Sequence, residues 1–197
     1  MKRALSPKKY FLLDINPVIR IMIISDVVWM SALGLLGPIF ALYVVDFIEG
    51  GNAVVTGTAF AIYLVTKSLF QIPVATIIDK IRGEKDDYWM LIIGSFAAAM
   101  LPLFYLVIHT PMGLYGLQFL LGIATAVTFP SYMAIFTRHI DVNKEGTEWG
   151  VYFTLVDLGA AAAASIGGVL AQTLGFSKLI RRIQVSIAPP LTELRPG

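Results

Sequence analysis

Five long apolar stretches run along the chain, separated by short segments that hold most of its charged residues. The stretches cover residues 18–45, 53–78, 88–108, 113–137 and 149–174. A bilayer core of ~30 Å needs about 20 helical residues, so each stretch is long enough to cross it, some with tilt. Backbone inside hydrocarbon is satisfied only in helices and closed barrels, and these runs lack the alternation of barrel strands. The pattern predicts an all-α polytopic membrane protein with five transmembrane helices.

Composition agrees with a membrane protein whose main partner is the lipid bilayer. Of the 197 residues, 57% are hydrophobic and 14% charged, whereas soluble domains have about 45–50% and about 25%. The net charge of +2 is too small to indicate a nucleic-acid partner. Cysteine is absent, and the two histidines, His109 and His139, lie singly at opposite faces of the membrane. We therefore expect no thiol chemistry, no metal site and no cofactor.

The basic residues indicate how the chain is oriented. The two connections at 46–52 and 109–112 carry no lysine or arginine, whereas the N-terminal segment and the other two connections carry ten: Lys2, Arg3, Lys8, Lys9, Arg20, Lys80, Arg82, Lys85, Arg138 and Lys144. This asymmetry places the N-terminus in the cytoplasm and the protein in the cell membrane. We divide the chain into a cytoplasmic arm at 1–17, a transmembrane bundle at 18–174 and an atypical tail at 175–197.

The connection after the second span has a recognisable pattern. The stretch "ATIIDKIRGEKDDYWML" resembles the cytoplasmic loop signature of the major facilitator superfamily, in which Asp-Arg follows a glycine by four residues and precedes a glycine and basic residues. Ala75 stands where the family prefers glycine, and the spacing after Lys80 is one residue longer. The matching positions are Asp79, Lys80, Arg82, Gly83 and Lys85. The resemblance covers about residues 15 to 175, the first five helices of the family's amino-terminal half.

The resemblance implies transport of a small solute by alternating access rather than enzymatic catalysis. In the family the loop acts as a latch between two halves, but any cytoplasmic loop also needs charge to stay out of lipid, so both interpretations are open. Gln118 occupies the place of an arginine linked to proton coupling in the family, which weakens coupling by that route. Ala163 and Ala164 replace the Gly-Pro of drug–proton antiporters. A non-transporting membrane subunit is the alternative function.

Three charged residues lie well inside the predicted spans: Asp26, Lys67 and Asp157. Helical rise places all three at similar depths, near the midplane or on its cytoplasmic side. A charge there costs at least ~2.5–3.5 kcal/mol, which favours a cluster facing the bundle interior with Lys67 paired to Asp26 or Asp157. Alternatively, Lys67 reaches toward the interface and Asp26 is protonated. The cluster interpretation marks a site for substrate or a coupling proton.

Polar residues also recur at helical spacing. The second span carries Tyr63, Lys67 and Gln71, and the fourth carries Tyr115, Gln118, Gly122, Thr125, Phe129 and Tyr132. We predict a pathway lined by Asp26, Lys67, Gln71, Gln118, Thr125, Tyr132 and Asp157, with ordinary helix packing as the alternative for any one of them. This mixture suits an uncharged or zwitterionic solute. The small residues Gly159, Ala163, Gly167 and Gly168 are predicted to allow close helix packing.

The C-terminal tail breaks the orientation pattern. Five spans starting inside leave the C-terminus outside, yet the tail carries Lys178, Arg181, Arg182 and Arg195. Its longest charge-free run, 183–192, contains Pro189 and Pro190 and is too short to cross a bilayer. We therefore expect an incomplete transporter, in which a sixth helix and a C-terminal half are missing.

Overall fold

The computed structural model describes residues 15–80 and 85–173, and in these ranges the chain is helical, without strands. The helices are α2 (Pro17–Phe47), α3 (Ala53–Lys80), α4 (Lys85–Met100), the 3-10 helix η1 (Leu101–Leu106), α5 (Pro111–His139) and α6 (Glu145–Thr173). With η1 continuing α4, five of these segments are long and apolar enough to cross a membrane. The predicted all-α fold with five spans is confirmed. Most of the arm and the whole tail lie outside the described residues.

Side-chain oxygens and prolines fix where several helices begin. Asn16 accepts a hydrogen bond of 2.9 Å from the Val18 amide, and Pro17 occupies the first turn of α2. Asn52 accepts bonds from the second and third amides of α3, at 2.8 and 3.1 Å. Thr110 caps α5 through the Gly113 amide at 3.3 Å. Capping of this kind satisfies amides that have no partner within the helix.

α4 differs from its predicted bounds at both ends. It begins at Lys85, three residues before the predicted start, with Asp86 and Asp87 in its first turn. Acidic side chains at this position are favoured by the positive end of the helix dipole. The α-helix ends at Met100 because Pro102 lacks an amide hydrogen, and the chain continues as η1.

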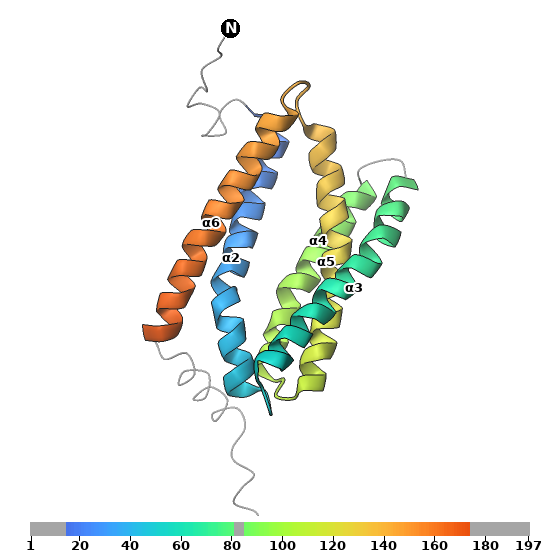
Figure 1. The fold of residues 1–197 in the computed structure, drawn as a ribbon. Helices are drawn as coiled ribbons and strands as arrows, with labels where there is room; N and C mark the ends of the chain where they lie inside the picture. Colours follow the sequence, from blue (N-terminus) through green and yellow to red (C-terminus); the bar gives the residue numbers. More distant parts are fainter. Residues whose placement is uncertain (1–14, 81–84, 174–197) are drawn as a thin grey trace, which may run out of the picture.

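The helices form two groups (Figure 1). α2 packs along α6, and both α3 and α4 pack on α5. Within the first group, Gly34 lies against the Ala160 backbone and Gly167 against the Leu35 backbone. Within the second group, Gly122 of α5 lies against Thr66 of α3. Glycines at these crossings let two helix backbones approach closely.

Two apolar clusters join the groups, one at each end of the bundle. At the end where α2 begins, hereafter the basic end, the cluster combines α2, α5 and α6 through Ile19, Met22, Ile23, Tyr132, Ile135, Phe136, Tyr152 and Val156. At the opposite end it combines α2, α3 and α5 through Tyr43, Val44, Ile48, Ala59 and Leu114. The polar residues of the spans lie mostly between these two clusters.

Candidate substrate pathway

The polar rows predicted on the second and fourth spans face each other in the structure. Tyr63 of α3 donates a hydrogen bond of 3.5 Å to Oγ1 of Thr125 on α5. One turn further along, the Lys67 ammonium nitrogen lies 4.8 Å from the centroid of the Phe129 ring. Gln118 is buried near the start of α5, at the end of the helix that lies away from Phe129. The strip is hereafter the α3 row of Tyr63, Lys67 and Gln71 with the α5 row that faces it, joined by the Tyr63–Thr125 and Lys67–Phe129 contacts.

The strip opens into a groove toward the basic end. The groove encloses about 540 Å³ between α3 and α5, and its walls are mainly apolar: Gln71, Ile72, Ala75, Ile78, Asp79, Phe129, Pro130, Met133, Ala134, Thr137 and Arg138. Gln71 and Phe129 belong to both the strip and the groove. An apolar groove with polar groups at its ends is typical of a binding site for a small amphipathic molecule.

A second polar site lies between α2, α5 and α6. Tyr152 of α6 donates a hydrogen bond of 2.7 Å to Oδ2 of Asp26 on α2. The Tyr132 ring of α5 lies 6.0 Å from that of Tyr152, and the Tyr132 hydroxyl is buried without a hydrogen-bond partner among the described residues. Phe136 and Trp149 enclose these rings on the side of the basic end. An acid thus sits within the spans beside two phenols in an aromatic shell.

The ion pair expected for Lys67 is not formed among the described residues. Lys67 belongs to the α3–α5 group and contacts Phe129, whereas Asp26 and Asp157 belong to the α2–α6 group. Asp26 bonds to Tyr152, and Asp157 is exposed on α6 with no hydrogen bond or ion pair in the described ranges. Helix pairing separates the charges, and sequence spacing cannot reveal which helices pair.

The small residues of α6 have different surroundings. A Cβ atom on Gly159 would lie 2.7 Å from Oγ of Ser31, and one on Gly167 would meet the Leu35 backbone. Ala163, which lies between these two glycines in the sequence, is half-buried. A Cβ on Gly168 would have nothing within 4 Å. Gly159 and Gly167 therefore lie on the α2 side, while Gly168 faces open space.

The residues of the loop signature lie at the basic end. Asp79 and Lys80 are exposed in the last turn of α3, and Lys85 is exposed at the start of α4. Arg82 and Gly83 fall outside the described residues. The latch therefore stays a prediction.

Sequence reasoning missed an ion pair beside this loop. Asp87 of α4 is fully buried and pairs with Arg138 of α5, which is 37% exposed. The pair joins α4 to α5 at the basic end. The apolar runs begin at 88 and end at 137, which leaves both residues in connections. Matching opposite charges at adjacent ends of two spans was the signal that could have revealed the pair.

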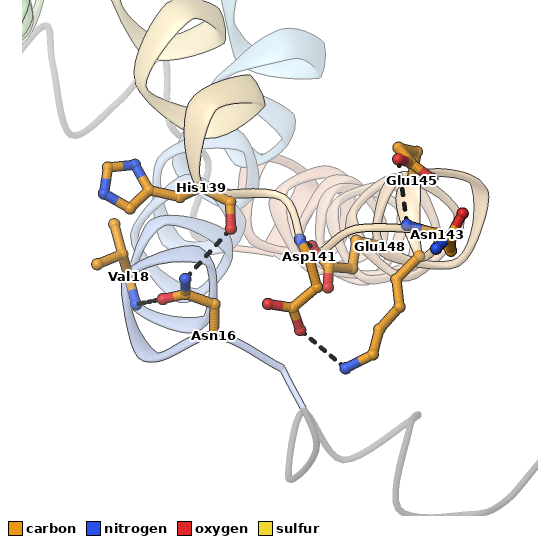
Figure 2. A network of polar contacts seen from close by, with 8 residues as sticks. Asn16, Val18, His139, Asp141, Asn143, Glu145 and Glu148 are labelled. Carbon is orange, nitrogen blue, oxygen red and sulfur yellow. Dashed lines mark hydrogen bonds and ion pairs between the residues drawn. The ribbon is translucent and has the colours of Figure 1, made fainter.

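The turn between α5 and α6 carries a polar network (Figure 2). Asn16 donates a bond of 3.2 Å to the His139 carbonyl, which ties the start of α2 to the end of α5. The buried Glu148 accepts from the Asp141 amide at 3.3 Å. The Lys144 ammonium group donates a hydrogen bond of 2.8 Å to Oδ2 of Asp141. This hydrogen bond lowers the pKa of the Asp141 carboxyl. The network fixes the geometry of the turn.

Comparison with known proteins identifies the family. The family model described as Major Facilitator Superfamily matches residues 22–180. The chain belongs to the major facilitator superfamily. It is 25% identical over 146 residues to an uncharacterized MFS-type transporter of Methanocaldococcus jannaschii. No solved structure matches the chain.

The match to the relative covers 74% of this chain and 36% of the relative. The chain thus spans about a third of the length of the Methanocaldococcus jannaschii relative. The described part of our chain has five helices that are long and apolar enough to span a membrane. The chain is therefore a multi-pass membrane protein of a transporter family.

Proposed function

We propose that the complete protein moves a small solute across the cell membrane by alternating access. Membership of the major facilitator superfamily supports a transporter. The main structural support is that two ionisable side chains lie within the spans. Asp26 accepts a hydrogen bond from the Tyr152 hydroxyl, and the Lys67 ammonium group lies over the Phe129 ring. Ionisable side chains at such depth are costly, and in membrane proteins they commonly mark substrate or proton pathways.

The pathway runs along the strip formed by α3 and α5 and past the acid of α2. From the α3–α5 group the pathway is lined by Lys67, Gln71, Gln118, Thr125 and Tyr132, and from the α2–α6 group by Asp26 and Asp157. Asp26 serves as the site for a coupling proton because it is an acid with a hydroxyl donor 2.7 Å away. A second helix bundle, in the same polypeptide or as a separate subunit, faces the exposed Asp157. The relative's greater length is consistent with that arrangement.

The basic end faces the cytoplasm in this proposal. Its helix ends carry Arg20, Lys80, Lys85, Arg138 and Lys144, while the segments 46–52 and 107–112 have no lysine or arginine. Basic residues are retained on the cytoplasmic side during membrane insertion. Because the chain lacks cysteine, single cysteines at Asn52 and Asn143 can be labelled in intact cells with a membrane-impermeant maleimide. Labelling at Asn52 but not Asn143 is expected, and the reverse would contradict the orientation.

Transport itself is tested with the complete protein in proteoliposomes. Counterflow of radiolabelled carboxylates, amino acids, sugars and amines is measured with and without a pH gradient across the membrane. Saturable uptake above protein-free vesicles, accelerated by the gradient, is the expected result for at least one solute class. Uptake equal to that of protein-free vesicles for every class would favour a non-transporting membrane subunit.

A further inference from the structure

Lys67 has an unusual position among the basic residues of the described spans. The other lysines and arginines of these helices lie within four residues of a helix end, whereas Lys67 lies midway along α3. Its ammonium group lies over the Phe129 ring, 4.8 Å from the centroid, and has no carboxylate partner among the described residues. A ring face stabilises a cation partly, but it does not neutralise the charge.

The nearest acids at this depth are engaged elsewhere or distant in the fold. Asp26 accepts from Tyr152 within the α2–α6 group. Asp157 lies on the exposed side of α6, which packs on α2 rather than on α3. The positive charge of Lys67 is thus left without a counter-charge in the described part of the bundle. Such a charge within a span is stabilised when an anion binds to it.

The surroundings of Lys67 indicate the shape of that anion. On one side, Tyr63 and Thr125 present hydroxyl groups. On the other side, Gln71 and Phe129 begin the groove of about 540 Å³, whose walls are largely apolar. A molecule with its anionic group at Lys67 would place an apolar body along this groove.

We propose that the substrate is a small organic acid whose carboxylate binds Lys67 and whose apolar body lies in the α3–α5 groove. This inference rests on the proposed transport function and replaces the expectation of an uncharged or zwitterionic solute. An amine is disfavoured because its charge repels the ammonium group. A phospholipid headgroup is also disfavoured as the source of the anion. Lys67 lies 13 residues before Lys80 at the end of α3, or ~20 Å along the helix.

Binding is measured on the complete protein in nanodiscs of neutral phosphatidylcholine, so that soluble acids alone supply the negative charge. The labelled probes are benzoate, hexanoate and succinate, and the matched competitors are benzamide and benzylamine. We expect at least one acid to bind above empty nanodiscs, with its affinity reduced about tenfold or more in Lys67→Met. Lys67→Arg should retain most of the affinity. Arg20→Met removes an exposed cation of α2 and should leave the affinity unchanged.

Competition on the unmodified protein tests the proposal without any variant. Benzamide has the shape of benzoate without its charge, so it should compete at least tenfold less well. A second set of nanodiscs with phosphatidylglycerol tests the lipid source, and loss of acid binding there would assign the site to the lipid. Absence of binding for all three acids, equal competition by benzamide, or unchanged affinity in Lys67→Met would each overturn the proposal.

The outcomes also separate this inference from the transport function. Binding of an acid at Lys67 without transport of any solute would support the site and contradict the function. Transport of sugars or amines without binding of any acid would support the function and contradict the site.

Discussion

The Tyr152 hydroxyl of α6 donates a hydrogen bond of 2.7 Å to Oδ2 of Asp26 on α2. The bond joins the two helices of one group, and the Tyr132 ring of α5 lies 6.0 Å from that of Tyr152. A phenol binds a charged carboxylate more strongly than a neutral one. Gain or loss of a proton at Asp26 therefore alters the bond between α2 and α6, in a cluster that also includes Tyr132 of α5.

Replacing Asp26 tests whether this proton matters. Asp26→Asn keeps an oxygen acceptor for Tyr152 but cannot exchange a proton at the working pH. We expect solute transport in proteoliposomes to fall at least ~10-fold, a loss of about 1.4 kcal/mol, and to lose its dependence on a pH gradient. Glu49→Gln, which neutralises an exposed acid beyond the end of α2, serves as the control. An unchanged rate and pH dependence in Asp26→Asn would refute a role for this acid.

The adjacent glycines of α6 offer a matched test of close packing. Alanine at either position gains about 1 kcal/mol of helix propensity. At Gly167 the new Cβ would lie 3.1 Å from Cα of Leu35 and closer still to its carbonyl oxygen, whereas at Gly168 it would meet nothing within 4 Å. We expect Gly167→Ala to lower the free energy of unfolding by about 1–3 kcal/mol and Gly168→Ala to leave it unchanged or raise it. Unfolding in mixed detergent micelles, followed by helical circular dichroism, measures both. Equal effects would mean that α6 does not approach α2 here.

A titration tests the ion pair in the turn between α5 and α6. The Lys144 hydrogen bond lowers the pKa of Asp141, so in the folded protein this carboxyl stays charged at a lower pH than in the unfolded chain. Its stabilising contribution is present above the unfolded pKa and is lost as pH falls through the lowered folded value. Lys144→Met should raise the Asp141 pKa toward its ordinary value, as measured by carbon-13 NMR of labelled aspartate. Lys85→Met, at the start of α4, should not shift it.

Sequence reasoning reached the number and approximate bounds of the helices because span length and hydropathy are local properties. It also placed Tyr63 and Lys67 in one row of the second span and Thr125 in a row of the fourth, since helical spacing alone puts such residues on one side of a helix. It did not predict that Lys67 contacts Phe129 rather than an acid, nor that Tyr152 bonds to Asp26. Both contacts depend on which helices pair, and that choice follows from close approaches such as Gly122 against Thr66.

The buried pair of Asp87 and Arg138 gives the last prediction. Asp87 has no exposed surface, and only one of its oxygens is paired, with Arg138. Removing one partner of a fully buried pair costs about 3–5 kcal/mol. Because Arg138 is 37% exposed, water can solvate the remaining charge, and we expect Asp87→Asn to cost about 2 kcal/mol. Detergent unfolding measures this loss.

A double-mutant cycle shows whether the loss comes from the pair. Arg138→Gln alone should also destabilise α4 against α5, because it leaves the Asp87 carboxylate buried without a cation. The two changes together should cost at least about 1 kcal/mol less than the sum of the single losses, because neither charge is then left without its partner. Asp86→Asn neutralises the neighbouring acid, which is half-buried with one oxygen lacking a partner, and should not reduce stability. Strict additivity in the cycle would show that Asp87 and Arg138 act independently, and the pair would then have no part in holding α4 on α5.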